Sequence, residues 1–251
     1  MSGNLSFKDK DCLPLFEALQ KVAANFGYGE LDTEGAVKDM VLAWKPVSPT
    51  VRALLGVNLG PALAPNTWML MPFVSLWSSY SAKIFIEANL YECDGQRFLE
   101  KTPDTLVILR MSPANFHWQD NPEIESASIR GHSGNINEMC DRIVLDYETY
   151  VAPVLDQFLT TEGAARFMLE APVYKTKRFP NVRPRFDQPL APIHTSIMLH
   201  EAAQPEKALE LLKTWQREGQ DQDFLNTPYG QNILCHVEKI IPYFEKNRHS
   251  N

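Results

Sequence analysis

The apolar residues of this chain change their spacing near residue 135, and that change limits the folds open to it. From Ile136 to Phe158 they recur every three or four positions, as expected for one face of an α-helix; the members are Ile136, Met139, Ile143, Tyr147, Tyr150, Val154 and Phe158. Before this point the clearest apolar run is 105–111, TLVILRM, whose length and β-branched residues predict a strand. Strands followed by helices indicate an α+β fold rather than a regular alternation of the two.

The first half is expected to be built around a sheet. An N-terminal helix is predicted over residues 7–26, because its apolar residues share one helical face. Further strands are predicted at 39–44, 53–59, 68–77 and 126–130, with one helix among them at 81–91. We therefore expect an N-terminal helix, a compact and mostly antiparallel sheet with one intervening helix, and an all-helical C-terminal half packed on or beside the sheet.

Prolines organise the helical half. Pro153 falls inside the long helical pattern, where a proline costs about 3 kcal/mol, so we expect a kink or a restart near residue 152. Residues 171–192 contain five prolines and are predicted to form a loop. Further helices are predicted at 161–169, 193–203, 205–219 and 228–244, the last of them capped by Thr227.

The same change of spacing predicts how the chain is divided. Residues 1–134 are expected to form the sheet-containing portion, and residues 135–251 the helical portion with the proline-rich, basic loop 171–192 inside it. A single domain is the alternative, because length is only a prior on the number of domains.

Composition bears on partners and location. The formal net charge of -7 disfavours nucleic acid and anionic membranes as general partners, because both depend on clustered Lys and Arg. The N-terminus has no apolar signal segment, and the four cysteines (Cys12, Cys93, Cys140, Cys235) have no compact spacing, so we expect free thiols in a reducing cytoplasm. Residues 53–82 carry no charged side chain, but prolines and glycines interrupt them, which favours a buried sheet over a membrane span.

The stretch 130–135, RGHSGN, is close to the G-x-S-x-G turn that presents a nucleophilic serine in α/β-hydrolases. Gly131 stands two residues before Ser133, as that turn requires, but Asn135 occupies the position of the second glycine. A helix is predicted to follow, and Asp187 with His236 would complete a triad in the order acid then histidine; His194 and His200 are the other candidate histidines.

A structural role explains the same residues. The preceding residues 125–130, ESASIR, lack the apolar run of a central parallel strand, and no regular alternation of strands and helices surrounds them. A turn over 131–134, with Ser133 or Asn135 capping the long helix, accounts for the composition. We favour this interpretation and keep a serine hydrolase centred on Ser133 as an alternative.

The sequence predicts neither a metal site nor a cofactor. Residues 200–204, HEAAQ, resemble the zinc-binding H-E-x-x-H helix, but Gln204 stands where the second histidine is needed. No glycine-rich phosphate-binding motif is present, so nucleotide binding has no support.

Two loops are candidate binding surfaces. Residues 174–186, YKTKRFPNVRPRF, are basic and aromatic in an acidic chain, which suits an acidic or aromatic partner, or phosphate contact with base stacking; the candidates are Lys175, Lys177, Arg178, Phe179, Arg183, Arg185 and Phe186. Ion pairing with acidic helices of the same chain is the alternative. The second loop follows the clearest strand, where His117, Trp118 and Asp120 could line a cleft with acid–base potential, or form an ordinary polar loop.

Because no catalytic motif is complete, we expect a soluble, cytoplasmic, non-enzymatic protein that recognises another macromolecule, with a protein as the expected partner. The alternatives are the serine hydrolase centred on Ser133, and nucleic-acid or anion binding through 174–186. The layout is similar to that of small bacterial α+β proteins, including immunity proteins that neutralise a partner toxin. This likeness implies an immunity-type or regulatory role and assigns no residue.

Overall fold

The computed structural model describes residues 7, 10–32, 40–61, 67–94, 106–111, 129–170, 191–218 and 226–247. These residues form an N-terminal helix, an antiparallel sheet of five strands and a set of helices in the C-terminal half, which confirms the predicted α+β class. They group into two compact units. Among the described residues, unit 1 comprises those up to Leu76 and from Leu109 to Asp156, and unit 2 comprises the remainder. The predicted division after residue 134 stays a prediction.

The sheet contains β1 (Met40–Pro46), β2 (Val51–Pro61), β3 (Trp68–Ser78), β4 (Leu106–Met111) and β5 (Ile129–Gly131). The strand order is β1-β2-β3-β4, and β5 also pairs with β3. Trp44 lies opposite Leu54 in the antiparallel β1–β2 pair, and Met69 lies opposite Arg130 in the antiparallel β3–β5 pair. All five strands overlap the predicted ones.

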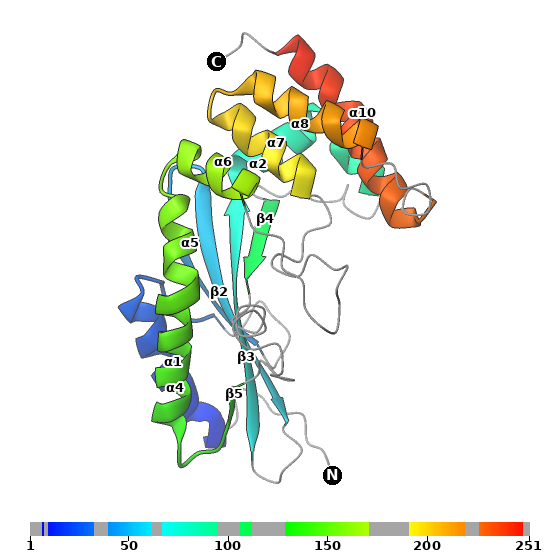
Figure 1. Ribbon diagram of the computed structural model, residues 1–251. Helices are drawn as coiled ribbons and strands as arrows, with labels where there is room; N and C mark the ends of the chain where they lie inside the picture. The colour runs from blue at the N-terminus through cyan, green and yellow to red at the C-terminus, as the bar shows by residue number, and fades with distance from the viewer. Residues whose placement is uncertain are drawn as a thin grey trace. The chain divides into compact units, whose positions relative to one another are not determined.

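Helices cover one side of the sheet in unit 1. The 3-10 turn η1 (Lys10–Cys12) leads into α1 (Leu13–Asn25), which packs against α4 (Ile136–Asp146), and α4 also contacts β5. Figure 1 shows both helices running along the same side of the strands. Val41 and Ala43 of β1 are 0% and 1% exposed, and Lys45, two residues further, reaches the carbonyl of Phe26 at the end of α1. These alternate residues therefore face the helices.

The long helix of unit 1 is interrupted where a kink or restart was predicted. The π-turn η4 (Tyr147–Val151) separates α4 from α5 (Ala152–Gln157), and the amide of Ala152 bonds to the carbonyl of Tyr147, five residues back. Pro153 follows directly and cannot donate to a carbonyl four residues earlier. A π-turn absorbs that missing hydrogen bond without breaking the helix.

Unit 2 is helical. It contains α2 (Ser79–Glu87), the 3-10 turn η2 (Leu90–Asp94), α6 (Thr161–Glu170), α7 (Ala191–Glu201), α8 (Pro205–Glu218) and α10 (Pro228–Lys246). Helix α7 packs against α2, α6 and α8, and α10 packs against α8 and η2. Residues 193–200 of α7 are all buried, so this helix lies at the centre of the unit. Thr227 Oγ1 accepts a hydrogen bond of 3.0 Å from the Gly230 amide, which confirms the predicted cap.

Two expectations about the chain as a whole can be compared with the structure. Within the described residues, no helix combines the length and the apolarity needed to cross a bilayer. The prediction of free thiols is wrong for Cys93 and Cys235, which form a disulfide with their Cα atoms 5.7 Å apart. They lie 142 positions apart, so only the packing of η2 against α10 brings them together, and spacing along the chain could not reveal it. Cys12 and Cys140 keep their thiols, both buried.

Candidate functional site

Ser133 lies in the turn that joins β5 to α4. The His132 amide donates a hydrogen bond of 2.7 Å to Asn135 Oδ1, and the Gly134 amide donates one of 3.0 Å to His132 Nδ1. Asn135 stands at the N-cap position of α4, but its Oδ1 accepts from the turn rather than from a helix amide, and its Nδ2 donates a hydrogen bond of 3.4 Å to Glu138 Oε2 in the first turn of α4. Ser133 is exposed, and within the described part of the chain no histidine is hydrogen-bonded to its hydroxyl.

Gly131 is glycine for a packing reason. A Cβ at this position would overlap Met139 Sδ on α4 and lie 2.6 Å from Asn135 Oδ1, so β5 can lie against α4 only without a side chain here. In addition, β5 is a three-residue strand antiparallel to β3, whereas a nucleophile elbow follows a strand of an α/β-hydrolase sheet. The geometry favours a simple strand-to-helix turn, although the role of Ser133 itself stays a prediction.

The other candidate triad residues lie elsewhere. His236 is on α10 in unit 2, with 0% exposure and its Nδ1 bonded to the Asn232 carbonyl at 2.7 Å. The alternative histidines, His194 and His200, are buried on α7 in the same unit. Asp187 lies outside the described residues, as do both candidate loops, with Lys175, Lys177, Arg178, Phe179, Arg183, Arg185, Phe186, His117, Trp118 and Asp120. These assignments remain predictions.

A surface that the sequence did not single out lies on the sheet of unit 1. Arg52 of β2 stacks on Trp44 of β1, with its guanidinium carbon 4.1 Å from the ring centroid. Trp44 is paired with Leu54, and Leu54 is two residues from Arg52, so the three side chains share one face of the sheet. Lys45, the neighbour of Trp44, reaches the helices on the other side. Arg52 and Trp44 therefore lie on the face opposite α1 and α4.

A second arginine lies on the same face. Arg110 of β4 stacks on Phe73 of β3, with the guanidinium carbon 4.3 Å from the ring centroid. The Phe73 ring covers Gly56 of β2 so closely that a Cβ there would overlap it. Gly56 is four residues from Arg52 along β2, and side chains alternate between faces. Phe73 and Arg110 therefore share the face of Arg52.

A third arginine extends this surface along β3. Arg130 of β5 is paired with Met69, and Met69, Met71 and Phe73 alternate onto one face. The methyl groups of Met69 and Met71 lie 3.2 and 3.9 Å from the Cβ position of Gly60, which is on the same face of β2. We call this surface the arginine face; it comprises Trp44, Arg52, Met69, Met71, Phe73, Arg110 and Arg130.

The arginine face has the composition of a binding surface. Its three arginines are exposed, and Trp44 and Met71 are 37% and 38% exposed. Arg, Trp, Phe and Met are the residues enriched at the cores of protein interfaces, and Trp and Arg are enriched among those that carry most of the binding energy.

Lys45 lies among aromatic rings on the helix side of the sheet. Its Nζ donates to the Tyr147 hydroxyl at 2.9 Å and to the Phe26 carbonyl at 3.1 Å, and lies 4.9 Å from the Tyr28 ring centroid. Burial lowers the pKa of Lys45, although nearby Asp156 opposes this effect. Burial raises the pKa of Tyr147 to about 12, so its hydroxyl stays protonated at neutral pH. The cluster supplies a donor to the C-terminal end of α1, which is a structural role.

Three buried histidines lie among aromatic rings in unit 2. His194 and His236 contact Phe85, with ring centroids 5.8 and 5.6 Å away, and His200 stacks on Phe244 at 4.5 Å. Each histidine is at most 5% exposed. In the parts of the chain that the structure describes, no group of three or more His, Cys, Asp or Glu side chains is placed to hold a metal ion. These histidines serve as aromatic core residues.

We expect unit 2 to lose stability as the pH falls below about 6.5. Burial lowers the pKa of His200 below its ordinary value, and the Tyr80 hydroxyl shares a 2.8 Å hydrogen bond with its Nδ1. The unfolded chain takes up this proton near pH 6.5, whereas the folded protein resists it until the pH reaches the lowered pKa. The stability that His200 contributes is therefore fully present above about pH 6.5, and it is lost progressively as the pH falls from there to the lowered pKa of the folded protein. Urea denaturation at a series of pH values measures the effect.

Two variants isolate the contribution of His200. His200→Phe keeps an aromatic ring against Phe244 and should give a flatter dependence of stability on pH than the wild type. His132→Gln removes an exposed histidine from the turn in unit 1 and should keep the wild-type dependence. Equal slopes in His200→Phe and the wild type would contradict the assignment.

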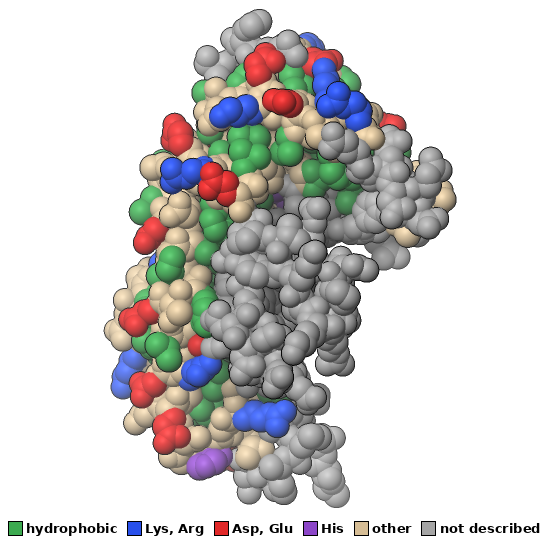
Figure 2. Space-filling model, viewed as in Figure 1, with side chains coloured by type: hydrophobic (Ala, Val, Ile, Leu, Met, Phe, Trp, Pro, Cys, Tyr) green, Lys and Arg blue, Asp and Glu red, His purple; other side chains and the backbone are tan. Residues whose placement is uncertain are grey.

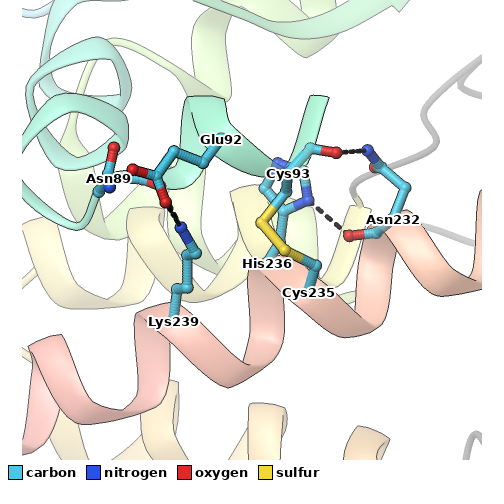
Figure 3. Close-up of a disulfide and its surroundings, with 7 residues drawn as sticks. All are labelled: Asn89, Glu92, Cys93, Asn232, Cys235, His236 and Lys239. Atoms are coloured by element: carbon cyan, nitrogen blue, oxygen red, sulfur yellow. Dashed lines mark hydrogen bonds and ion pairs between the residues drawn. A yellow bond between two sulfur atoms is a disulfide. The ribbon is translucent and has the colours of Figure 1, made fainter. Parts of the chain in front are cut away.

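The disulfide links η2 to α10 in the same unit (Figure 3). Asn232 Nδ2 donates a hydrogen bond of 2.8 Å to the Cys93 carbonyl, and the Asn232 carbonyl bonds to His236 Nδ1. Cys235 and His236 are adjacent on α10, so the covalent link and the buried histidine hold the same turn of that helix.

Comparisons with known proteins give no further assignment. Neither a model of a protein family, nor a curated protein, nor a solved structure matches this chain.

Proposed function

We propose that this protein is a non-enzymatic binding protein that recognises another macromolecule. The observation that carries the proposal is the arginine face, where exposed Arg, Trp and Met side chains lie together on the face of the sheet opposite α1 and α4 in unit 1. By contrast, Lys45 and the three buried histidines, which have catalytic potential, make structural contacts. Lys45 holds the end of α1, and the three buried histidines pack among aromatic rings.

The proposal includes a protein as the bound macromolecule and an immunity-type or regulatory role. It also includes a cytoplasmic location. The disulfide is an argument against that location, because disulfides persist mainly in oxidising compartments.

The proposal is tested by purifying the tagged chain from its native source under mild conditions and rebuilding any complex from purified components. A stoichiometric complex that reforms and co-migrates in size-exclusion chromatography is the expected result. Failure to recover any stoichiometric partner, together with a monomer at all concentrations, would count against it.

A serine hydrolase centred on Ser133 is the competing function, because Ser133 is exposed between a strand and a helix. We expect a fluorophosphonate probe to leave the protein unlabelled, and Ser133→Ala to change the free energy of unfolding by less than about 0.5 kcal/mol, as is usual for an exposed position. Mass spectrometry of the treated protein measures the labelling. Stoichiometric labelling of the wild type that Ser133→Ala abolishes would replace the binding proposal with the hydrolase.

A further inference from the structure

We infer that the arginine face binds an acidic segment of a partner protein through carboxylate groups. This inference rests on the proposed binding function and adds to it a surface and the chemistry of the ligand. Within the described part of the chain, no carboxylate is ion-paired with Arg110 or Arg130.

The aromatic stacks orient two of the arginines. The guanidinium groups that lie over Trp44 and Phe73 have less freedom to rotate than free side chains, and the N–H donors of a guanidinium lie along the edges of its own plane. A planar group held in this way can donate two parallel hydrogen bonds to a carboxylate, and less side-chain entropy is lost on binding than for a freely rotating side chain. A lysine has neither the plane nor the paired donors.

The spacing of the arginines indicates a ligand with several charges. Arg52 on β2 and Arg110 on β4 are two strand spacings of ~4.8 Å apart, and Arg52 also lies four residues, about 13 Å, along β2 from Gly56, the residue that Phe73 covers. Arg130 is level with Met69, about 13 Å along β3 from Phe73 at ~3.3 Å per residue. No single small anion bridges these distances, whereas an extended peptide covers the length from Arg52 to Arg130 with about eight residues.

Charge is distributed unevenly over unit 1. The helical layer formed by α4, η4 and α5 carries four exposed acidic side chains, Glu138, Asp141, Glu148 and Asp156, and its one arginine, Arg142, is paired with Asp146. In Figure 2, acidic side chains stand along the helices of unit 1. Asp32 forms an antiparallel bridge with Leu42 of β1, and this pairing places it on the arginine face. It is the one acidic residue that pairing with β1 places there among the described residues. An acidic partner is therefore attracted to the arginine face and repelled by the helical layer, which sets its orientation.

A protein fits this surface better than a nucleic acid does. Single strands bind on aromatic rings that bases can stack on, but the Phe73 ring lies between the backbone at Gly56 and the Arg110 guanidinium. The net charge of -7 also repels a long polyanion, whereas a short acidic segment meets mainly the local arginines.

The test measures fluorescence anisotropy with two labelled probes, a short poly-L-glutamate of about eight residues, enough to span the face when extended, and an oligothymidylate of similar length. Arg52→Gln, Arg110→Gln and Arg130→Gln are each expected to weaken poly-L-glutamate binding about 10-fold, as for loss of a charge-assisted hydrogen bond. The matched control is Arg166→Gln, which removes an equally charged and exposed arginine from α6 in unit 2 and should have no effect. Arg110→Lys keeps the charge but loses the planar group, and should also lose most of the affinity.

Three results with these probes would overturn the inference. They are unchanged affinity in all three glutamine variants, full affinity in Arg110→Lys, and tighter binding of the oligothymidylate than of poly-L-glutamate. Concentration-dependent self-association that the same variants abolish would assign the face to a second copy of the chain and would overturn it as well. Circular dichroism and urea denaturation confirm that each variant folds, and Arg130, which has no aromatic stack beneath it in the described contacts, provides a variant that leaves the packing of the sheet intact.

The native complex distinguishes this inference from the proposed function. If a stoichiometric partner binds the arginine variants as well as the wild type, the inference fails and the binding function stands. If no partner is recovered with the wild type, the proposed function itself fails.

Discussion

Replacing both Cys93 and Cys235 by serine is expected to lower the free energy of unfolding by up to about 5 kcal/mol. A cross-link between two residues 142 positions apart removes conformational entropy from the unfolded chain, and the value is calculated from that loss. It is an upper limit, because removing a disulfide often costs less than this entropy predicts. The bond joins the first and the last chain segments of unit 2, and between them the chain passes through unit 1. Urea denaturation of the double variant against the wild type measures the loss.

The reductant dependence of the wild type is the control. Dithiothreitol should lower the denaturation midpoint of the wild type toward that of the serine variant, and should leave the variant unchanged. The ion pair between Lys239 and Glu92 also links α10 to η2, so this region should keep native packing after the bond is removed. A thiol titration that finds four reactive groups in the denatured wild type without reductant would contradict the disulfide.

The elements of the fold could be predicted because their determinants are local in the sequence. The strand at 106–111 follows from its own apolar residues, and the start of α10 follows from Thr227 and the proline after it. The position of the helix interruption also followed from Pro153, but its form did not. A helix can accommodate the hydrogen bond that proline cannot donate either by a kink or by a π-turn, and packing of the surrounding residues decides between the two.

The arginine face could not be predicted, because it depends on which strands are neighbours. Arg52, Arg110 and Arg130 are 20 or more positions apart in sequence. Alternation within each strand shows which residues share a face of that strand, but says nothing about which residues of another strand lie beside them. The pairing of β5 with β3 and the stack of Arg110 on Phe73 are long-range contacts, and only the folded sheet brings them together.

The RGHSGN turn illustrates the opposite case, in which a local pattern has two explanations. Its glycine can allow a tight turn at a nucleophile or close packing of a helix, and the sequence is the same for both. The structure shows that Gly131 provides room for Met139, which is a contact that does not involve Ser133.

Phe85→Ala is expected to destabilise the protein by about 3–5 kcal/mol, the range for removing a buried phenylalanine side chain. Phe85 is 1% exposed, and its ring contacts Tyr91, His194 and His236 at centroid distances of 5.6, 5.8 and 5.6 Å. Its loss leaves a cavity between α2 and the neighbouring η2 on one side and the distant helices α7 and α10 on the other. Urea denaturation gives the free energy, and faster amide hydrogen exchange in these elements should locate the change.

The adjacent residue supplies the matched control. Ile86 lies on the same helix but is 49% exposed, so Ile86→Ala should cost no more than about 0.5 kcal/mol. The contrast separates loss of packing from any effect of alanine on the helix, because both variants place alanine in α2. If the two variants were equally stable, Phe85 could not be the residue that joins the buried histidines of α7 and α10 into one core.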